Sequence, residues 1–325
     1  MDSESEQTVP RQNARDVSPQ RPHAAGPSRD CSPSVSVVMP AFNAGDALAE
    51  QLAALLDQHV ESVTEIIVVD NRSTDNTRAI VQAAVKVAAA NDGWLSVRYV
   101  SATARPGAAY ARNVGIEASQ GQTILFCDAD DMVQANWISE LARTVETHGA
   151  AAGYMDKFQG RTASRETVVD SDTAAQSWHG TALLWPVTCN FGIRRDLLAK
   201  VGTFDEDLRS GEDIDLGVRM HNAGVALHQS DARIFYRLRP DGEAALSQLM
   251  TYAYWDAFLL FRHRRTLSLV GSSLHSPQHQ LRRVLGHVRR LPLFLRRDDA
   301  RGWLAEFRTR LIALRGYVDS VRSHR

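Results

Sequence analysis

Three carboxylates lie close together in the segment Cys127-Asp128-Ala129-Asp130-Asp131, directly after a short apolar run. Neighbouring carboxylates repel one another unless a cation or a basic group compensates their charge. A divalent cation such as Mg²⁺ or Mn²⁺ suits this position, because it takes one or two protein carboxylates and completes its shell with water and substrate phosphates. The same acids could instead cap a helix expected over Ala135–Thr147, which is a purely structural role.

A second acidic segment reads Gly211-Glu212-Asp213-Ile214-Asp215-Leu216 and opens a helix expected over Asp213–Ala223. A carboxylate at this place could act as a general base that removes the proton of an incoming hydroxyl group. The helix dipole also stabilises acids in a first turn, so a structural role is the alternative.

Two loops upstream carry groups that could bind a nucleotide. The proline of Pro40-Ala41-Phe42-Asn43 cannot donate to a strand ladder, so the chain must leave the sheet there. Phe42 is then placed either to stack on a planar group such as a nucleobase or to pack within its loop. Asp70 could accept from a base N–H or a ribose hydroxyl, or it could stabilise the turn that precedes the capping residues Ser73–Asp75.

These polar segments follow short apolar or β-branched runs that we interpret as strands. Four such runs start about 30 residues apart, the length of a strand–helix–strand unit: Ser34–Met39, Glu65–Val69, Leu95–Val100 and Thr123–Cys127. Helical spacing of leucines over Leu48–Leu56 and the run Ala79–Ala90 fill the gaps between them. The alternation predicts an α/β fold with a mostly parallel sheet, in which ligands bind outside the carboxyl ends of the strands.

The composition divides the chain into three parts. Residues 1–33 hold five of the 11 prolines and are rich in Ser, Gln and Arg, which predicts disorder. Residues 34–240 are expected to form one catalytic domain, with a loop and weak strands over Gly160–Gln176. Residues 241–325 are expected to form a helical, Arg-rich extension.

That extension is strongly basic, although the whole chain has a net charge of −1. From Arg262 to Arg325 there are 15 arginines, no lysine and four acids. Apolar stripes are expected in Leu281–Leu295 and at six positions further on: Trp303, Phe307, Leu311, Leu314, Val318 and Val321. The stripes could lie on an anionic membrane leaflet or pack on the preceding domain with solvated arginines. We find no nucleic-acid-binding motif.

The remaining composition is that of an ordinary globular protein, with 44% hydrophobic and 23% charged residues. The three cysteines have no metal-type spacing and suit a reducing compartment. No apolar run reaches the roughly 18 residues of a membrane span, and no secretory signal is apparent. These features favour a cytoplasmic location.

Five segments together resemble the family 2 glycosyltransferases, which have a single Rossmann-like glycosyltransferase A fold. The resemblance covers roughly Ser34 to Pro240. In chain order, the segments are Pro40-Ala41-Phe42-Asn43, Val68-Val69-Asp70-Asn71-Arg72-Ser73-Thr74-Asp75, Gly107 to Gly115 with Ala111-Arg112-Asn113, Asp128-Ala129-Asp130-Asp131, and Gly211 to Leu216.

The resemblance implies a nucleotide-diphosphate sugar as donor. Pro40, Phe42 and Asp70 would hold the nucleotide, and Arg105 and Arg112 would lie near its pocket. Arg112 could equally be the structural partner of an acid.

The resemblance also implies roles for the two acidic segments. Asp128 would contact ribose, and Asp130 would bind a divalent cation, Mg²⁺ or Mn²⁺, on the diphosphate. Asp213 would be the catalytic base, with Glu212 positioning the acceptor or the base. Transfer to a hydroxyl group of a glycan or lipid-linked acceptor would invert the anomeric centre.

Two positions depart from the family's pattern. Ala44 stands where the family often has an acid, and Tyr236 stands where many members have a histidine that contacts the metal or diphosphate. Tyrosine can donate to a phosphate but is a poor Mg²⁺ ligand at pH 7. His228 is a candidate substitute for that histidine.

Two other functions compete with sugar transfer. A sugar nucleotidyltransferase also uses an α/β sheet and Mg²⁺, but its first loop usually carries basic residues that Pro40–Asp46 lacks. A degenerate protein that only binds a nucleotide sugar or glycan would not need both Asp130 and Asp213. A dehydrogenase is not supported, because no Gly-x-Gly-x-x-Gly follows a strand.

Overall fold

The computed structural model describes residues 33–90, 93–158, 167–238, 243–274, 276, 278–279, 282 and 300–323. The segment expected to be disordered, 1–33, lies outside these residues except for its last one. Most of the first apolar stripe, Leu281–Leu295, lies outside them as well.

The first half of the central sheet is parallel. Its strand order is β3-β2-β1-β4, formed by β1 (Val35–Ala41), β2 (Thr64–Asp70), β3 (Leu95–Ser101) and β4 (Thr123–Phe126). All seven residues of β2 are buried, which explains its central β-branched run Ile66–Val69. The four expected strands are therefore confirmed, with ends that differ by one or two residues.

The second half of the sheet is mixed and follows β4 in the order β10-β6-β11-β5, with β7 paired to β6. Only the β6–β11 pair is parallel among the pairings described there. Its strands are β5 (Met132–Val133), β6 (Ala150–Phe158), β7 (Val168–Thr173), β10 (Phe191–Arg194) and β11 (His228–Arg237). A separate two-stranded sheet contains β8 (Ala175–Ser177) and β9 (Leu184–Pro186), and short 3-10 turns span Trp178–Gly180 and Thr188–Asn190.

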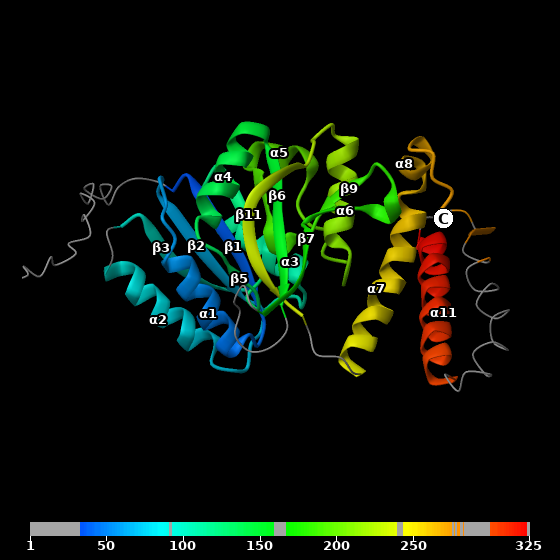
Figure 1. Cartoon of the computed structure of the whole chain (residues 1–325), viewed down its shortest axis with the longest axis horizontal. Helices are drawn as coiled ribbons and strands as arrows, with labels where there is room; N and C mark the ends of the chain where they lie inside the picture. The colour runs from blue at the N-terminus through cyan, green and yellow to red at the C-terminus, as the bar shows by residue number, and fades with distance from the viewer. Residues whose placement is uncertain are drawn as a thin grey trace, which may run out of the picture.

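Helices cover both faces of the central sheet (Figure 1). One face is covered by α1 (Gly45–Leu56), α2 (Thr77–Ala90) and α4 (Trp137–His148), and the other by α3 (Ala108–Ala118), α5 (Arg195–Val201) and α6 (Glu212–Asn222). Within β1, Val37 faces the first of these layers and Val38 the second, as the two-residue period of a strand requires. The sheet is thus the middle layer of a three-layer α/β fold, as predicted.

The C-terminal helices pack beside this fold, next to α6 (Figure 1). They are α7 (Glu243–Arg262), α8 (Arg264–Leu269) and α11 (Ala300–Ser323). Leu259 of α7 and Leu267 of α8 join Val218 of α6 in one buried apolar cluster. Part of the extension therefore packs on α6, through residues that belong to neither predicted stripe.

Helix α11 contacts α7 through a different face from the predicted stripe. Ala313 and Tyr317 are buried against α7, and a Cβ atom on Gly316 would lie 2.1 Å from the backbone oxygen of Tyr254. Leu311 and Val318 of the predicted stripe are instead 43% and 38% exposed. Gly316 lets the two helix backbones approach closely. Of the predicted stripe, Val321 does pack against this cluster, so the prediction is wrong about the packed face at Leu311 and Val318.

The described residues contain no helix that is both long enough and apolar enough to cross a lipid bilayer.

A buried ion cluster connects α6 to the C-terminal helices. Asp215 is 1% exposed and accepts from Arg219 Nε at 2.8 Å and from His263 Nε2 at 2.9 Å. Burial opposes the charge of this carboxylate, but the hydrogen bond from His263 and the charge of Arg219 outweigh burial and lower the pKa of Asp215 to about 2. The helix that carries Glu212 and Asp213 is thereby tied to the residue that precedes α8.

We expect Asp215→Asn to lower the free energy of unfolding at pH 7 by about 3–5 kcal/mol, the range for breaking one side of a buried ion pair. The lowered pKa means that the stabilisation by the carboxylate is complete above the unfolded-state pKa near 4 and is lost as the pH falls toward 2. Urea denaturation between pH 7 and pH 3 measures the difference in the free energy of unfolding between the parent and the variant. This difference should be smaller at pH 3 than at pH 7.

The control is Asp196→Asn, which removes an acid that is paired with Arg194 but has a 63% exposed side chain. Exposed pairs contribute about 0–1 kcal/mol, so this variant should remain close to the parent. An equal loss in both variants would contradict the importance of the buried cluster.

Candidate functional site

The first acidic motif forms a tight turn between β4 and β5. Gln51, a fully buried side chain of α1, clamps the turn by donating to the carbonyl of Asp128 and accepting from the N–H of Val133, both at 2.9 Å. From the other side, Arg237 of β11 donates from Nε to the carbonyl of Asp130 at 3.0 Å and from its backbone N–H to Asp131 Oδ1 at 2.9 Å. The positions of the three carboxylates are therefore set by elements distant in sequence.

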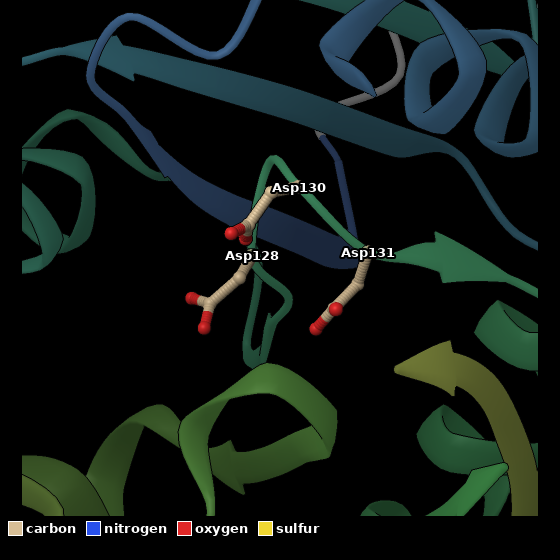
Figure 2. Close-up of side chains that lie close together, drawn as sticks. All are labelled: Asp128, Asp130 and Asp131. Carbon is tan, nitrogen blue, oxygen red and sulfur yellow. The ribbon is translucent and has the colours of Figure 1, made fainter. Parts of the chain in front are cut away.

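Figure 2 shows Asp128, Asp130 and Asp131 extending from this one turn. Each offers a carboxylate oxygen, and these three atoms lie within 4.8 Å of one another. Asp130 is exposed, whereas Asp131 is 2% exposed and its Oδ2 atom has no hydrogen-bond partner within the described residues. Burial, followed by repulsion from Asp128 and Asp130, raises the pKa of Asp131 well above its usual range. The turn has the donor set of a site for a hard divalent cation.

Arg112 joins the two acidic motifs. Its side chain, on α3, is 4% exposed and donates to Asp128 Oδ1 and to Glu212 Oε1, each at 2.8 Å. Burial disfavours the guanidinium charge, but the two carboxylates outweigh burial and raise the pKa of Arg112. One arginine thus holds the end of β4 and the start of α6 on the same edge of the sheet.

Asp213 lies in the first turn of α6, next to Glu212. Gly211 precedes the helix with a φ of 78°, a left-handed conformation that glycine adopts at little cost. Burial, followed by the neighbouring charge of Glu212, raises the pKa of Asp213 to about 8, although Arg112 opposes the shift. A carboxylate with this pKa is suited to exchange a proton near neutral pH.

A cleft of about 870 Å³ opens along this edge of the sheet. Its lining comes from the carboxyl ends of β1, β2 and β4 and from the start of α3, as expected for a ligand site in an α/β fold. Five of the predicted site residues line it: Pro40, Phe42, Arg112, Asp128 and Asp130. Phe42 is 64% exposed, so its ring is free for stacking rather than packed within its loop.

Asp70 and Arg105 do not line this cleft. Asp70 is 6% exposed and accepts from the N–H of Ser73 at 2.9 Å and from the hydroxyl of Tyr99 at 2.8 Å. The geometry therefore shows the turn-stabilising contacts that were one of the two interpretations of Asp70.

The guanidinium of Arg105 turns toward the loop before α6. It pairs with Glu206 at 3.1 Å and with Asp207 at 2.6 Å, and its side chain is 49% exposed. Asn113 of α3 fixes the same loop by donating to Glu206 and to the carbonyl of Phe204, both at 2.9 Å. Arg105 thus lies beside the pocket rather than in its wall.

His228 cannot replace the histidine that the family often has near the diphosphate. Its ring stacks on His148 at a centroid distance of 4.3 Å, at the start of β11. Tyr236 lies about 26 Å further along the strand, given about 3.3 Å per residue, next to the residue that binds Asp131 through its backbone. Burial and the nearby groups of Cys189 and Asp131 raise the pKa of Tyr236, so its hydroxyl remains protonated at neutral pH.

Two residues that organise the site were not predicted from the sequence, Gln51 and Arg237. Gln51 had a local signal, since it is a polar residue on the leucine face of α1 and is completely buried. Arg237 had none, because its contacts with the acidic turn depend on how β11 joins the sheet. Asn190, just before β10, is buried and accepts from Trp137 Nε1 at 2.8 Å.

The sequence of this chain is similar to a glycosyltransferase family model and to proteins of known name. The family model described as Glycosyl transferase family 2 matches residues 36–202, which include the acidic turn. Glycosyltransferase AglE of Haloferax volcanii is 30% identical over 223 residues, covering 66% of this chain and 71% of that protein. Succinoglycan biosynthesis protein ExoO of Rhizobium meliloti is 28% identical over 253 residues, covering 72% and 68%.

A solved structure shares the fold. Mannosyltransferase PcManGT from Pyrobaculum calidifontis, in complex with GDP-Man and Mn²⁺, has a TM-score of 0.58 and 17% identity, over 93% of this chain and 91% of that one. The family match spans more than half of this chain and contains the cleft-lining ends of β1, β2 and β4. The chain therefore belongs to glycosyl transferase family 2 and is a glycosyltransferase that transfers a sugar from a nucleotide sugar.

Proposed function

We propose that the cleft binds a nucleotide-diphosphate sugar and that the enzyme transfers the sugar, with inversion, to a hydroxyl group of a glycan or lipid-linked acceptor. The observation that supports this most is the fork of Arg112, which holds Asp128 and Glu212 at 2.8 Å each. The fork joins the acidic turn to the start of α6, which supports a role for Asp213, the residue after Glu212, as the base. Membership of this family removes the sugar nucleotidyltransferase alternative.

The nucleotide would lie along the wall formed by Pro40 and Phe42, with its ribose at Asp128. Asp70 would act mainly by fixing the turn after β2, because both of its oxygens already accept hydrogen bonds. Arg105 would support the adjoining loop through its two ion pairs. Arg112 would hold Asp128 in place through its ion pair, as it also holds Glu212.

The acidic turn fits a divalent cation, Mg²⁺ or Mn²⁺. Asp130 would be the protein ligand, since it is exposed and lines the cleft. Two features favour a cation there: the three carboxylate oxygens within 4.8 Å and the unpartnered buried Oδ2 of Asp131. When bound, such an ion neutralises negative charge on a departing nucleoside diphosphate.

Removal of the cation should weaken nucleotide binding. We expect calorimetric titrations with UDP, GDP and dTDP to identify a nucleotide that binds with Mn²⁺ and binds at least about tenfold more weakly in EDTA. Asp130→Ala should cause a similar loss in the presence of Mn²⁺, because it removes the proposed ligand.

The matched control is Asp57→Ala, at the other end of α1, where an exposed acid lies away from the cleft. This variant should bind like the parent. Equal nucleotide affinity in Mn²⁺ and in EDTA would contradict the metal site.

Asp213 would accept the proton of the acceptor hydroxyl as that oxygen attacks the anomeric carbon on the face opposite the leaving diphosphate. The proton moves to the Asp213 carboxylate, the new glycosidic bond forms and the bond to the diphosphate breaks. Glu212, fixed by Arg112, would position the base or the acceptor. This route needs no covalent intermediate with the protein.

Asp213→Asn should lower kcat by roughly 10²–10⁴-fold, the usual contribution of a general base, and leave nucleotide affinity unchanged. Only the deprotonated form can act as the base, so a pKa of about 8 should make kcat/KM fall about tenfold per pH unit below pH 8. Rate measurements from pH 6 to pH 9 test both expectations.

Asp231→Asn, which changes an exposed acid on β11, serves as the control and should keep the parent profile. An Asp213→Asn enzyme with the parent rate would eliminate the base assignment. A parent enzyme without turnover would instead favour the alternative of a degenerate binding protein.

We further propose that residues 34–240 form the catalytic domain and that the 241–325 extension contacts an anionic membrane. The enzyme would then work at the cytoplasmic face of the cell membrane. The outward stripe of α11 supports this contact, since Leu311 and Val318 are exposed beside Arg315 and Arg322, whose side chains are 79% and 77% exposed. A helix with an apolar stripe between arginines binds anionic lipid surfaces. No nucleic-acid partner is proposed.

Vesicle sedimentation tests this contact. The protein should bind vesicles that contain phosphatidylglycerol more tightly than vesicles of phosphatidylcholine. The double variant Leu311→Ser, Val318→Ser should bind the anionic vesicles roughly tenfold more weakly, because two apolar side chains no longer enter the interface.

Val87→Ser, at an exposed position on α2 at the opposite end of the molecule (Figure 1), should have no effect on vesicle binding. Equal affinity for both kinds of vesicle, or none for either, would show that the arginines of α11 are only solvated.

A further inference from the structure

Arg72 adopts a backbone conformation that is unfavourable for its residue type. It directly follows the turn at the end of β2 and has a φ of 70°, in the left-handed region. Asparagine, which occupies this region at Asn43 and Asn136, tolerates it better than arginine does. Strained residues of this kind occur mostly where a site requires a particular side chain.

The surrounding turn holds Arg72 in this conformation. Asp70 accepts from the N–H of Ser73 at 2.9 Å, and Asn71 donates to the carbonyls of Ala102 and Arg105 at 2.6 and 2.8 Å. The backbone on both sides of Arg72 is therefore fixed, and its side chain lines the cleft.

The other polar side chains of the cleft around Arg72 are used within the protein. Asn43 Oδ1 accepts from the N–H of Thr74 at 2.7 Å, and Asn71 Oδ1 accepts from the N–H of Gly107 at 2.9 Å. Arg112, the other arginine in the lining, is bound to two carboxylates. Within the described residues, the guanidinium of Arg72 makes no hydrogen bond or ion pair and is the cation of this lining that is available to a ligand.

The sheet order places Arg72 at one end of the bound nucleotide. Arg72 follows β2 and the acidic turn follows β4, and the two strands lie on opposite sides of β1. Neighbouring strands are about 4.8 Å apart, so the two strand ends are separated by about 10 Å. A diphosphate held at Asp130 would therefore extend its nucleoside toward Phe42 and Arg72.

We propose that Arg72 reads the exocyclic carbonyl of the nucleobase and selects a keto base, uracil or guanine, over its amino counterpart, cytosine or adenine. This inference rests on the proposed function, because it assumes that a nucleotide occupies the cleft. A guanidinium only donates hydrogen bonds, so it matches O4 of uracil or O6 of guanine and is mismatched with an amino group. Phe42, 64% exposed in the same wall, supplies the surface on which the base stacks.

The test compares nucleotides whose bases carry either a carbonyl or an amino group at that position. Calorimetry with Mn²⁺ present should show that the parent prefers UDP over CDP, or GDP over ADP, by at least about fivefold, the lower limit for a bidentate arginine–base contact. Arg72→Gly should reduce this preference to about one and leave the affinity for the amino-base nucleotide unchanged. Arg72→Lys should keep part of the preference, because lysine donates without the fork.

Two measurements guard against other causes. Arg72→Gly should have a Tm at or above that of the parent, since glycine accepts a φ of 70°; a lower Tm would contradict the strain at this turn. Arg143→Ala, on α4 and outside the cleft lining, should preserve the preference.

The remaining outcomes separate the two proposals. Equal weakening of both nucleotides of a pair by Arg72→Gly would place the guanidinium on the phosphates or ribose and overturn the base assignment. An unchanged preference in Arg72→Gly, or a parent without preference, would overturn it as well. A parent that binds none of the four nucleotides would instead count against the proposed donor site itself.

Discussion

The charge balance around Arg112 is the constraint on which the site depends. A nearly buried guanidinium stays charged because carboxylates from two separate motifs, Asp128 and Glu212, lie 2.8 Å from it. Removing one partner of a buried pair typically costs about 3–5 kcal/mol, so the three side chains stabilise one another as a unit. Within the acidic turn, Arg112 compensates the charge of Asp128, whereas repulsion from Asp128 and Asp130 still contributes to the raised pKa of Asp131. The same pairing holds the start of α6, which carries Asp213, beside the acidic turn.

The cleft uses its polar groups in two distinct ways. Side chains such as Asp70 and Asn71 form hydrogen bonds with backbone groups of the loops, which makes the rim after β2 rigid. This leaves a small set of groups that face the cleft with their chemistry available, among them the ring of Phe42 and the guanidinium of Arg72. A rigid rim with few free groups is how a site gains selectivity at a low entropic cost. Shape and hydrogen bonding at this rim would then set which donor is accepted.

Helix α6 connects the site to the C-terminal helices. Its first turn carries Glu212, Asp213 and Asp215, and Asp215 is bound by Arg219 and by His263 beside α8. The apolar cluster of Val218, Leu259 and Leu267 adds buried area to the same junction. Because the acids of α6 and the helices of the extension move as one packed unit, contact of α11 with a surface would orient the cleft relative to that surface.

Local sequence patterns determined the strands, the helices and the edge of the sheet where Asp128 and Asp130 lie. Those patterns reflect burial and backbone geometry within a few residues, and parallel strands must end on one rim. Only the tertiary structure decided what each side chain meets there: Asp70 and Arg105 face protein partners, and Gln51 and Arg237 clamp the acidic turn. It also decided that His228 lies at the far end of β11 and that α11 packs through Gly316 rather than Leu311. Such outcomes depend on contacts between residues far apart in the chain, which periodicity and spacing do not encode.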